Sequence, residues 1–458
     1  MTNKSEGIKK PQKASKVDQN VEKSSETDSK QQPSFQHEIS AFAFEIESLY
    51  RANIQTLKVV TNSAKELVEE LTKFIEDRSE TTETEEGKTA YKIKPNDLQQ
   101  LEKRAKDLRA SSLAIKKIPQ IFFCALIHQY DAFLGKLLRV AFYVKPELLN
   151  ASQKQMTYSE LRSYSSLDEA CRHLVEKEIE SIIRESHADQ FVWMEKRFGL
   201  SLRKDLHIWP SFIEMTERRN LFVHCDGVVS SQYIADCRAH GAKLDEEIKL
   251  GNVLTVNKEY FVNAVDCIME IGIKLGHVLW RKLQPNQLGA ADESLHLISY
   301  DLLVDEKYKL AKTLLQFATD TLKKHSSDSI RRMNLINLAI AHYYTGKKET
   351  ASKILDSQDW SACEDKFKLA VSVLRDNYSE AEKVMKKIGK RGEVSREAYS
   401  TWPLFRKFRE SKEFLRTYKK LFGEDFFVPK FAVEQGLVNH KSNQPDATAD
   451  HAPVARSG

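Results

Sequence analysis

Glycine and proline are scarce in this chain of 458 residues, which contains 16 Gly and 11 Pro. Both residues disfavour helix interiors, so their scarcity beside long periodic apolar patterns predicts a mainly α-helical protein. The six cysteines form no Cys-x-x-Cys pair and show no zinc-ligand spacing. Several lie within apolar helical stretches, and we therefore expect free thiols in a reducing cytosol.

Several catalytic motifs are also missing. The chain has no glycine-rich phosphate loop of either common type, no His-Glu-x-x-His pair, no nucleophile elbow and no spaced carboxylate or Cys/His metal set. These absences argue against the common nucleotide-loop enzymes, zinc proteases and α/β hydrolases. We expect neither a metal nor a cofactor.

Long uninterrupted apolar runs are absent as well. Residues 121–144 come closest, but polar side chains interrupt them: His128, Gln129, Asp131, Lys136 and Arg139. No hydrophobic signal stands at the N-terminus, so the sequence predicts a cytoplasmic protein without a membrane partner. Lys and Arg (71) barely exceed Asp and Glu (66), and this small excess identifies no partner.

What the chain does contain is an Arg/His pair in residues 216–227, which read T-E-R-R-N-L-F-V-H-C-D-G. Histidine moves protons near neutral pH and a guanidinium stabilises a phosphorane, so Arg219 and His224 suit a metal-free ribonuclease. Helical projection places Arg219 in the middle of an apolar stripe formed by Phe212, Met215, Phe222 and Val223. A guanidinium there needs a carboxylate, a phosphate or a second protein surface as its partner.

The same projection places Asn220 and His224 together on the flank of that stripe, roughly 140° from Arg219. One ideal helix therefore does not easily bring Arg219 and His224 side by side. Two such helices at a symmetric seam could do so, and fraying of the helix towards Gly227 would also let His224 swing.

This arrangement resembles the HEPN superfamily, whose small helical bundles carry an Arg, a polar residue and a His near the end of a late helix. The continuation Cys-Asp-Gly-Val-Val to residue 229 is similar to bacterial members, and the resemblance covers roughly residues 115–285. It implies a homodimer whose two Arg/His pairs line a cleft for single-stranded RNA. The ribose 2′-hydroxyl would attack its own phosphate without a metal.

The resemblance also implies roles for individual residues. His224 would act as general acid or base, Arg219 would stabilise the phosphorane, and Asn220 would orient the phosphate or His224. Asp131 is the only acid of the apolar residues 121–144, and we expect it to hold Arg219. The alternative is an Asp131 bonded to a neighbouring Lys or to the backbone. His173 and His187 are expected at the surface, and His207 in a turn.

Around this central region the sequence predicts further parts. Residues 1–36 and 436–458 are polar tails expected to be disordered. Residues 37–114 hold a long helix (38–78) with a heptad-like apolar seam in which Asn53 fills one step, then a mobile loop (79–92) and a charged helix (about 95–112). A helical hairpin is favoured over an intermolecular coiled coil. Residues 115–285 form the bundle, with single helices expected over 166–198 and 260–283 and a short extended segment at 242–257.

Residues 295–435 show short paired helices. Residues 338–351 resemble a tetratricopeptide hairpin, and residues 368–381 repeat the form 30 positions later, so the repeat is degenerate. Such modules bind protein or nucleic acid. Residues 383–420 hold 13 Lys and Arg against 4 Asp and Glu, interleaved with aromatics that either stack on RNA or form core. The candidate RNA contacts are Arg218, Lys386, Lys387, Lys390 and Arg391.

Two functions follow from these features. The first is a metal-independent endoribonuclease for single-stranded RNA, with a role in a bacterial toxin or anti-phage defence system. The second is a non-catalytic scaffold in which Arg219 and Asn220 tie protomers together and the repeats bind a protein partner. An Arg219 bonded wholly within its own protomer, with His224 facing solvent alone, would favour the scaffold.

Overall fold

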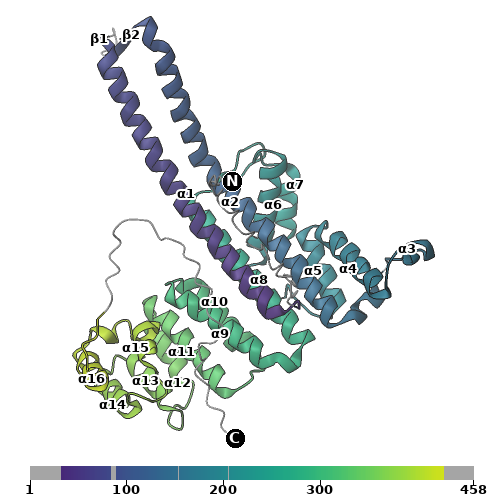
Figure 1. Ribbon diagram of the computed structural model, residues 1–458, viewed down its shortest axis with the longest axis vertical. Helices are drawn as coiled ribbons and strands as arrows, with labels where there is room; N and C mark the ends of the chain where they lie inside the picture. Colours follow the sequence, from purple (N-terminus) through teal and green to yellow (C-terminus); the bar gives the residue numbers. More distant parts are fainter. Residues whose placement is uncertain (1–31, 84–88, 153, 205, 428–458) are drawn as a thin grey trace, which may run out of the picture.

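The computed structural model describes residues 32–83, 89–152, 154–204 and 206–427. Helices hold 75% of the chain and strands 2%, which confirms the predicted mainly α class. Figure 1 shows a long two-helix arm that rises from a helical body, with the last helices gathered at the opposite end of the molecule. Residues 1–31 of the first predicted tail and the whole of the second, 436–458, lie outside the described residues, whereas Phe35 and Gln36 belong to a helix and not to a disordered tail.

The arm is formed by α1 (Phe35–Arg78) and α2 (Pro95–Val144), which pack against each other. α1 begins three residues earlier than predicted, because the Ser34 side chain caps it and Phe35 is buried beside Trp280. At the tip, β1 (Ser79–Glu83) pairs antiparallel with β2 (Thr89–Ile93). The mobile loop predicted at 79–92 was therefore wrong in part, since its threonines favour a strand.

α2 is a single helix of 50 residues that crosses the boundary predicted at 114/115. Pro119 does not end it, because packing against α1 and α8 holds both halves. Twelve residues of its second half, from Phe123 to Phe142, are buried in the core. By length and composition α2 is the one helix of the described chain apolar enough to cross a membrane. The absence of a membrane partner stays a prediction.

The middle of the chain packs around α2 and α8 (Lys258–Leu283), and α8 agrees closely with the helix predicted at 260–283. The predicted helix 166–198 is two helices, α4 (Leu167–Ile183) and α5 (His187–Phe198), because Ser186 caps a new start. The predicted extended segment 242–257 contains only an isolated bridge from Val253 to Val228. The remaining elements here are η1 (Pro146–Ala151), α3 (Tyr158–Arg162), α6 (Trp209–His224) and α7 (Ser231–Ala239).

The C-terminal part consists of short helices that pair as α9 with α10, α11 with α12, and α13 with α14. Their bounds are η2 (Pro285–Gln287), α9 (Leu288–Val304), α10 (Tyr308–Gln316), η3 (Phe317–Thr321), α11 (Asp328–Tyr344), α12 (Lys348–Asp356), α13 (Asp365–Leu374), α14 (Tyr378–Ile388), α15 (Arg396–Thr401), η4 (Pro403–Phe405), η5 (Phe408–Glu410) and α16 (Lys412–Phe422). Membership of a repeat family stays a prediction.

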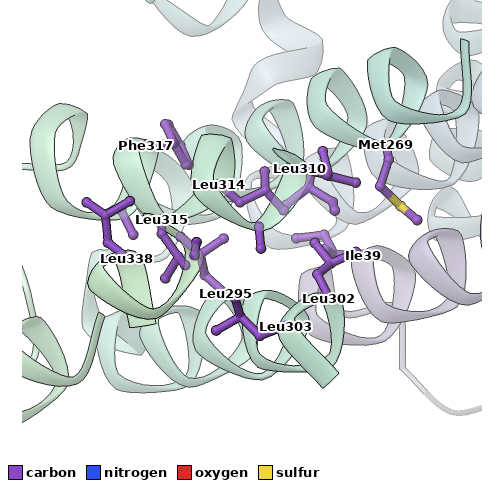
Figure 2. Close-up of a cluster of buried hydrophobic side chains, with 14 of the residues drawn as sticks. Ile39, Met269, Leu295, Leu302, Leu303, Leu310, Leu314, Leu315, Phe317 and Leu338 are labelled. Atoms are coloured by element: carbon purple, nitrogen blue, oxygen red, sulfur yellow. The ribbon is translucent and has the colours of Figure 1, made fainter. Parts of the chain in front are cut away.

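One hydrophobic core joins the arm base, the middle helices and the C-terminal helices. Figure 2 shows Ile39 of α1 and Met269 of α8 beside leucines of α9 and α10, among them Leu295, Leu302, Leu303, Leu310, Leu314 and Leu315. The body of the protein therefore has one main core, and a second small cluster packs the end of α6 against α7: Leu221, Val229, Tyr233, Cys237 and Leu254.

Candidate functional site

The Arg219 side chain meets α2 as the sequence suggested. Its NH2 group donates to Oδ2 of Asp131 at 3.0 Å, joining α6 to α2. The side chains are 23% and 18% exposed, so the pair lies at the edge of the core. The Asp131 carboxylate offsets the desolvation cost of the Arg219 guanidinium at this partly buried position. The hydrogen bond also fixes one edge of the planar guanidinium.

His187 holds the other oxygen of the same carboxylate. Its Nε2 lies 2.8 Å from Oδ1 of Asp131, and its side chain is only 7% exposed. The ring packs edge-on against Phe212 and tilted against Tyr130. Asp131 thus connects three helices, α2, α5 and α6.

The surface position predicted for His187 was wrong because residues 166–198 were taken as one helix. The break before α5 makes His187 the first residue of that helix and turns it inward. The sequence carried a signal for this break: Ser186 accepts a hydrogen bond from the Asp189 backbone N–H at 3.2 Å, a helix-start pattern.

His224 is the last residue of α6, and its side chain is exposed. Within the described residues that side chain makes no hydrogen bond and no ion pair. Asn220, one turn earlier, donates to Oε2 of Glu217 at 3.3 Å. A single chain therefore does not join Arg219 to His224, in line with the angular separation that the sequence predicted.

The apolar stripe predicted for α6 is shorter than expected. Phe212 and Met215 are buried, and Phe222 packs edge-on against Phe123 with ring centroids 5.8 Å apart. Val223, by contrast, is 55% exposed, which corrects its assignment to the core. The end of α6 therefore presents both Val223 and His224 to solvent.

Arg218 does not fit the role of an RNA contact. Its side chain is 9% exposed, donates to Oε1 of Glu214 at 2.7 Å and lies over the ring of Tyr260 at 4.0 Å. Glu214 also accepts hydrogen bonds from the hydroxyls of Tyr233 and Tyr260, at 2.6 and 2.7 Å. Arg218 is thus part of a buried network that locks α6 to α7 and α8, and the earlier expectation for it was wrong.

The basic C-terminal residues lie elsewhere. Lys386 and Lys387 pair with Glu382 and Asp365 at 2.7 and 2.9 Å, whereas Lys390 and Arg391 are exposed just after α14. Figure 1 places α14 at the opposite end of the body from α6. The interleaved aromatics are buried, which fits core and not a stacking platform: Tyr399, Trp402, Phe405, Phe408, Phe414 and Tyr418.

The chemistry available near Arg219 is otherwise limited. Cys124 lies on α2 two turns before Asp131, and burial raises the pKa of its thiol although the charge of Arg219 acts in the opposite direction. A raised pKa keeps the thiol protonated and disfavours it as a nucleophile. In the part of the chain that the structure describes, no group of three or more His, Cys, Asp or Glu side chains is arranged to hold a metal ion.

Comparisons with protein-family models, with curated proteins and with solved structures found no match for this chain. The resemblance to the HEPN superfamily therefore depends on the Arg219, Asn220 and His224 pattern and its surroundings alone.

Proposed function

We propose that the protein is a metal-independent endoribonuclease of the HEPN type that cleaves single-stranded RNA as a homodimer. The observation that supports this most is the Arg219, Asn220 and His224 pattern at the end of α6, in which Asp131 fixes Arg219 and His187 holds Asp131 in turn. A preorganised guanidinium at the edge of the core is what charge stabilisation in a transition state requires.

In the proposed reaction the 2′-hydroxyl oxygen attacks the adjacent phosphorus and the P–O5′ bond breaks. His224 takes the proton of the 2′-hydroxyl or delivers a proton to the leaving 5′-oxygen, and Arg219 stabilises the phosphorane charge. The products are a 2′,3′-cyclic phosphate and a 5′-hydroxyl. Within one chain, Arg219 and His224 lie on different sides of α6. A second copy of the chain would therefore supply the other Arg/His pair at the dimer seam.

A scaffold is the second candidate function, and a specific observation favours it. The hydrogen bond of Arg219 to Asp131 is made within one chain, and His224 faces solvent without a partner among the described residues. In this function the end of α6 joins protomers, and the paired C-terminal helices bind a protein partner.

The test is cleavage of mixed single-stranded RNAs in EDTA by three proteins: the wild type, His224→Ala and His207→Ala. His207 is an exposed histidine on the loop before α6 and serves as the matched control. We expect 2′,3′-cyclic phosphate ends from the wild type and His207→Ala, and at least about a hundredfold slower cleavage by His224→Ala. Equal cleavage by all three proteins would reject the catalytic role of His224. Absence of cleavage by all three would favour the scaffold function.

A further inference from the structure

One face of α2 carries a row of cations along the arm. Lys103, Lys106, Arg109 and Lys116 are exposed, and Lys117 is half-buried, 43% exposed at its side chain. At about 100° per residue these five side chains fall within one side of the helix, opposite the face that packs on α1. Arg104 marks that other face, since it lies over Phe74 of α1 at 5.0 Å.

This basic face, defined by those five residues, continues directly into the candidate site. Lys117, Cys124 and Asp131 are spaced by seven residues and so lie along one line of α2. Lys117 contacts Asp226, just beyond the end of α6, at 2.7 Å, and Asp131 contacts Arg219. The helix continues through Pro119 between them, so the row of cations and the Arg219 partner lie on one continuous helix.

The charge of this face is mostly uncompensated. On the described part of α2 between residues 95 and 121, Glu102 shares this side and Asp107 lies at its edge, one turn after Lys103, against five cations. The ion pairs found there are those of Asp97 with Arg78, of Arg104 with Glu70 and of Lys117 with Asp226, so four of the five cations of the face have no ion pair among the described residues. The other helix of the arm is less basic, because residues 65–78 of α1 contain five acids and three Lys or Arg.

Exposed apolar side chains accompany the cations. Leu113 and Ile121 project from the same side of α2 and are 57% and 63% exposed. A row of cations can follow the phosphates of a single nucleic-acid strand, and Leu113, between Arg109 and Lys116, offers an apolar contact to a base. From Lys103 to Lys117 the row extends about 21 Å along the helix axis.

We propose that the basic face of α2 binds the phosphodiester backbone of single-stranded RNA and guides the strand to Arg219 and His224. This proposal rests on the proposed ribonuclease function, because that function supplies the reason for a strand to reach the end of α6. Each phosphate neutralised by a lysine or arginine releases a counterion, so binding through this face weakens as salt rises.

The test measures binding separately from cleavage. Full-length His224→Ala is titrated into a fluorescent 20-nucleotide oligouridylate at several KCl concentrations, and anisotropy gives Kd. In this background the triple variant Lys106→Gln, Arg109→Gln, Lys116→Gln removes three cations of the face. We expect Kd at about 0.1 M salt to rise at least about tenfold, and the slope of log K against log salt to fall by about 2.

The matched control removes three exposed lysines from the other helix of the same arm: Lys58→Gln, Lys65→Gln and Lys73→Gln. It changes net charge equally, and we expect Kd within about twofold of the parent. An equal loss of RNA affinity in the two triple variants, or no loss in either, would overturn the proposal. The basic face would then be a candidate surface for an acidic protein partner. A matched oligothymidylate tells the backbones apart: tighter binding of RNA supports the proposal, and binding of DNA alone overturns it.

Failure of the two proposals is distinguishable. If the α2 variant loses RNA binding while the wild type never cleaves, the proposal for the basic face is supported and the proposed ribonuclease function is rejected. The opposite result is that the wild type cleaves RNA, His224→Ala does not, and the α2 variant binds RNA with an unchanged Kd. In that case the ribonuclease function is supported and the proposal for the basic face is rejected.

Discussion

Asp131 joins three helices through two oxygens, one to His187 and one to Arg219. The sequence indicated half of this arrangement, because a lone acid in an apolar helix and a lone arginine in an apolar stripe each need a partner. It did not indicate the other half. His187 became visible as a member of the site only once the break at 184–186 turned it toward α2.

His277 is a second buried residue with a measurable consequence. Neither ring nitrogen has a hydrogen-bond partner among the described residues, and the side chain is fully buried beside Trp280. Burial lowers the pKa of His277 to about 3, the charge of Arg281 acts in the same direction, and Asp292 opposes it. The unfolded chain takes up this proton near the ordinary histidine pKa, whereas the folded protein does not.

Stability from the neutral form of His277 is therefore fully present above about pH 6.5 and is lost as pH falls towards about 3. At pH 5 the loss amounts to about 2 kcal/mol. We expect His277→Leu to lack this dependence on pH. Between pH 7.5 and pH 5, the free energy of unfolding measured in urea should therefore fall by about 2 kcal/mol more for the wild type than for the variant.

Three other histidines with pKa lowered by burial, His296, His325 and His342, are common to both proteins and cancel in this comparison. Equal losses in the wild type and the variant would show that His277 takes up its proton at an ordinary pH in the fold.

At the scale of the element, the approach of α1 to α8 depends on two glycines. A Cβ at Gly272 would lie 2.6 Å from Cζ of Phe42, and a Cβ at Gly276 would lie 2.6 Å from Cγ1 of Ile39. Phe42 has no room to move, because it is buried and stacked on Phe133 with centroids 4.2 Å apart. The glycines therefore serve close packing of two helices and not a turn.

We expect Gly272→Ala to lower the free energy of unfolding by about 1–3 kcal/mol, since overpacking outweighs the better helix propensity of alanine. Urea unfolding at pH 7.5 measures the change. The control is Gly289→Ala in α9, where the nearest atom to a new Cβ is 4.0 Å away. There we expect no loss, or a gain of up to about 1 kcal/mol. An unchanged free energy of unfolding in Gly272→Ala would show that α1 moves to accommodate the new methyl group without a loss of stability.

At the scale of the whole molecule, burial is distributed unevenly. Beyond Ile46, the buried residues of α1 are Asn53 and Ala64, and α2 has none before Phe123. One main core and one small cluster hold the body together, whereas the arm depends on the contact of two helices with each other. Segments with few buried side chains open at a lower free energy than the core.

We therefore expect amide hydrogens at residues 57–78 and 95–113 to exchange at least about a hundredfold faster than those at 126–142 and 264–280. Hydrogen–deuterium exchange followed by mass spectrometry measures this ratio. Uniform protection across the four segments would mean that something covers the arm in solution, such as a second copy of the chain, and would contradict the description of a bare two-helix arm.

Local chemistry was enough for much of the fold. Scarce glycine and proline predicted helices, the seam of residues 38–78 predicted a long helix, and the apolar residues 121–144 predicted a central helix; the two patterns are periodicities that one segment carries by itself. The seam left open a hairpin or an intermolecular coiled coil, and the charged helix that follows favoured the hairpin. The aromatics of residues 383–420 were ambiguous for the same reason. Spacing says that they share a face, but not whether that face meets RNA or protein.

Other features depended on contacts between distant segments, which no local pattern encodes. Tertiary packing carried α2 past Pro119, buried Arg218 under Glu214, and brought His187 to the carboxylate that holds Arg219. It also aligned the cations of α2 with the end of α6, since only the packed fold fixes which side of each helix faces which neighbour. The sequence by itself determined that Arg219 needed a partner; the tertiary structure decided that Asp131 is that partner and that His224 stands apart from it.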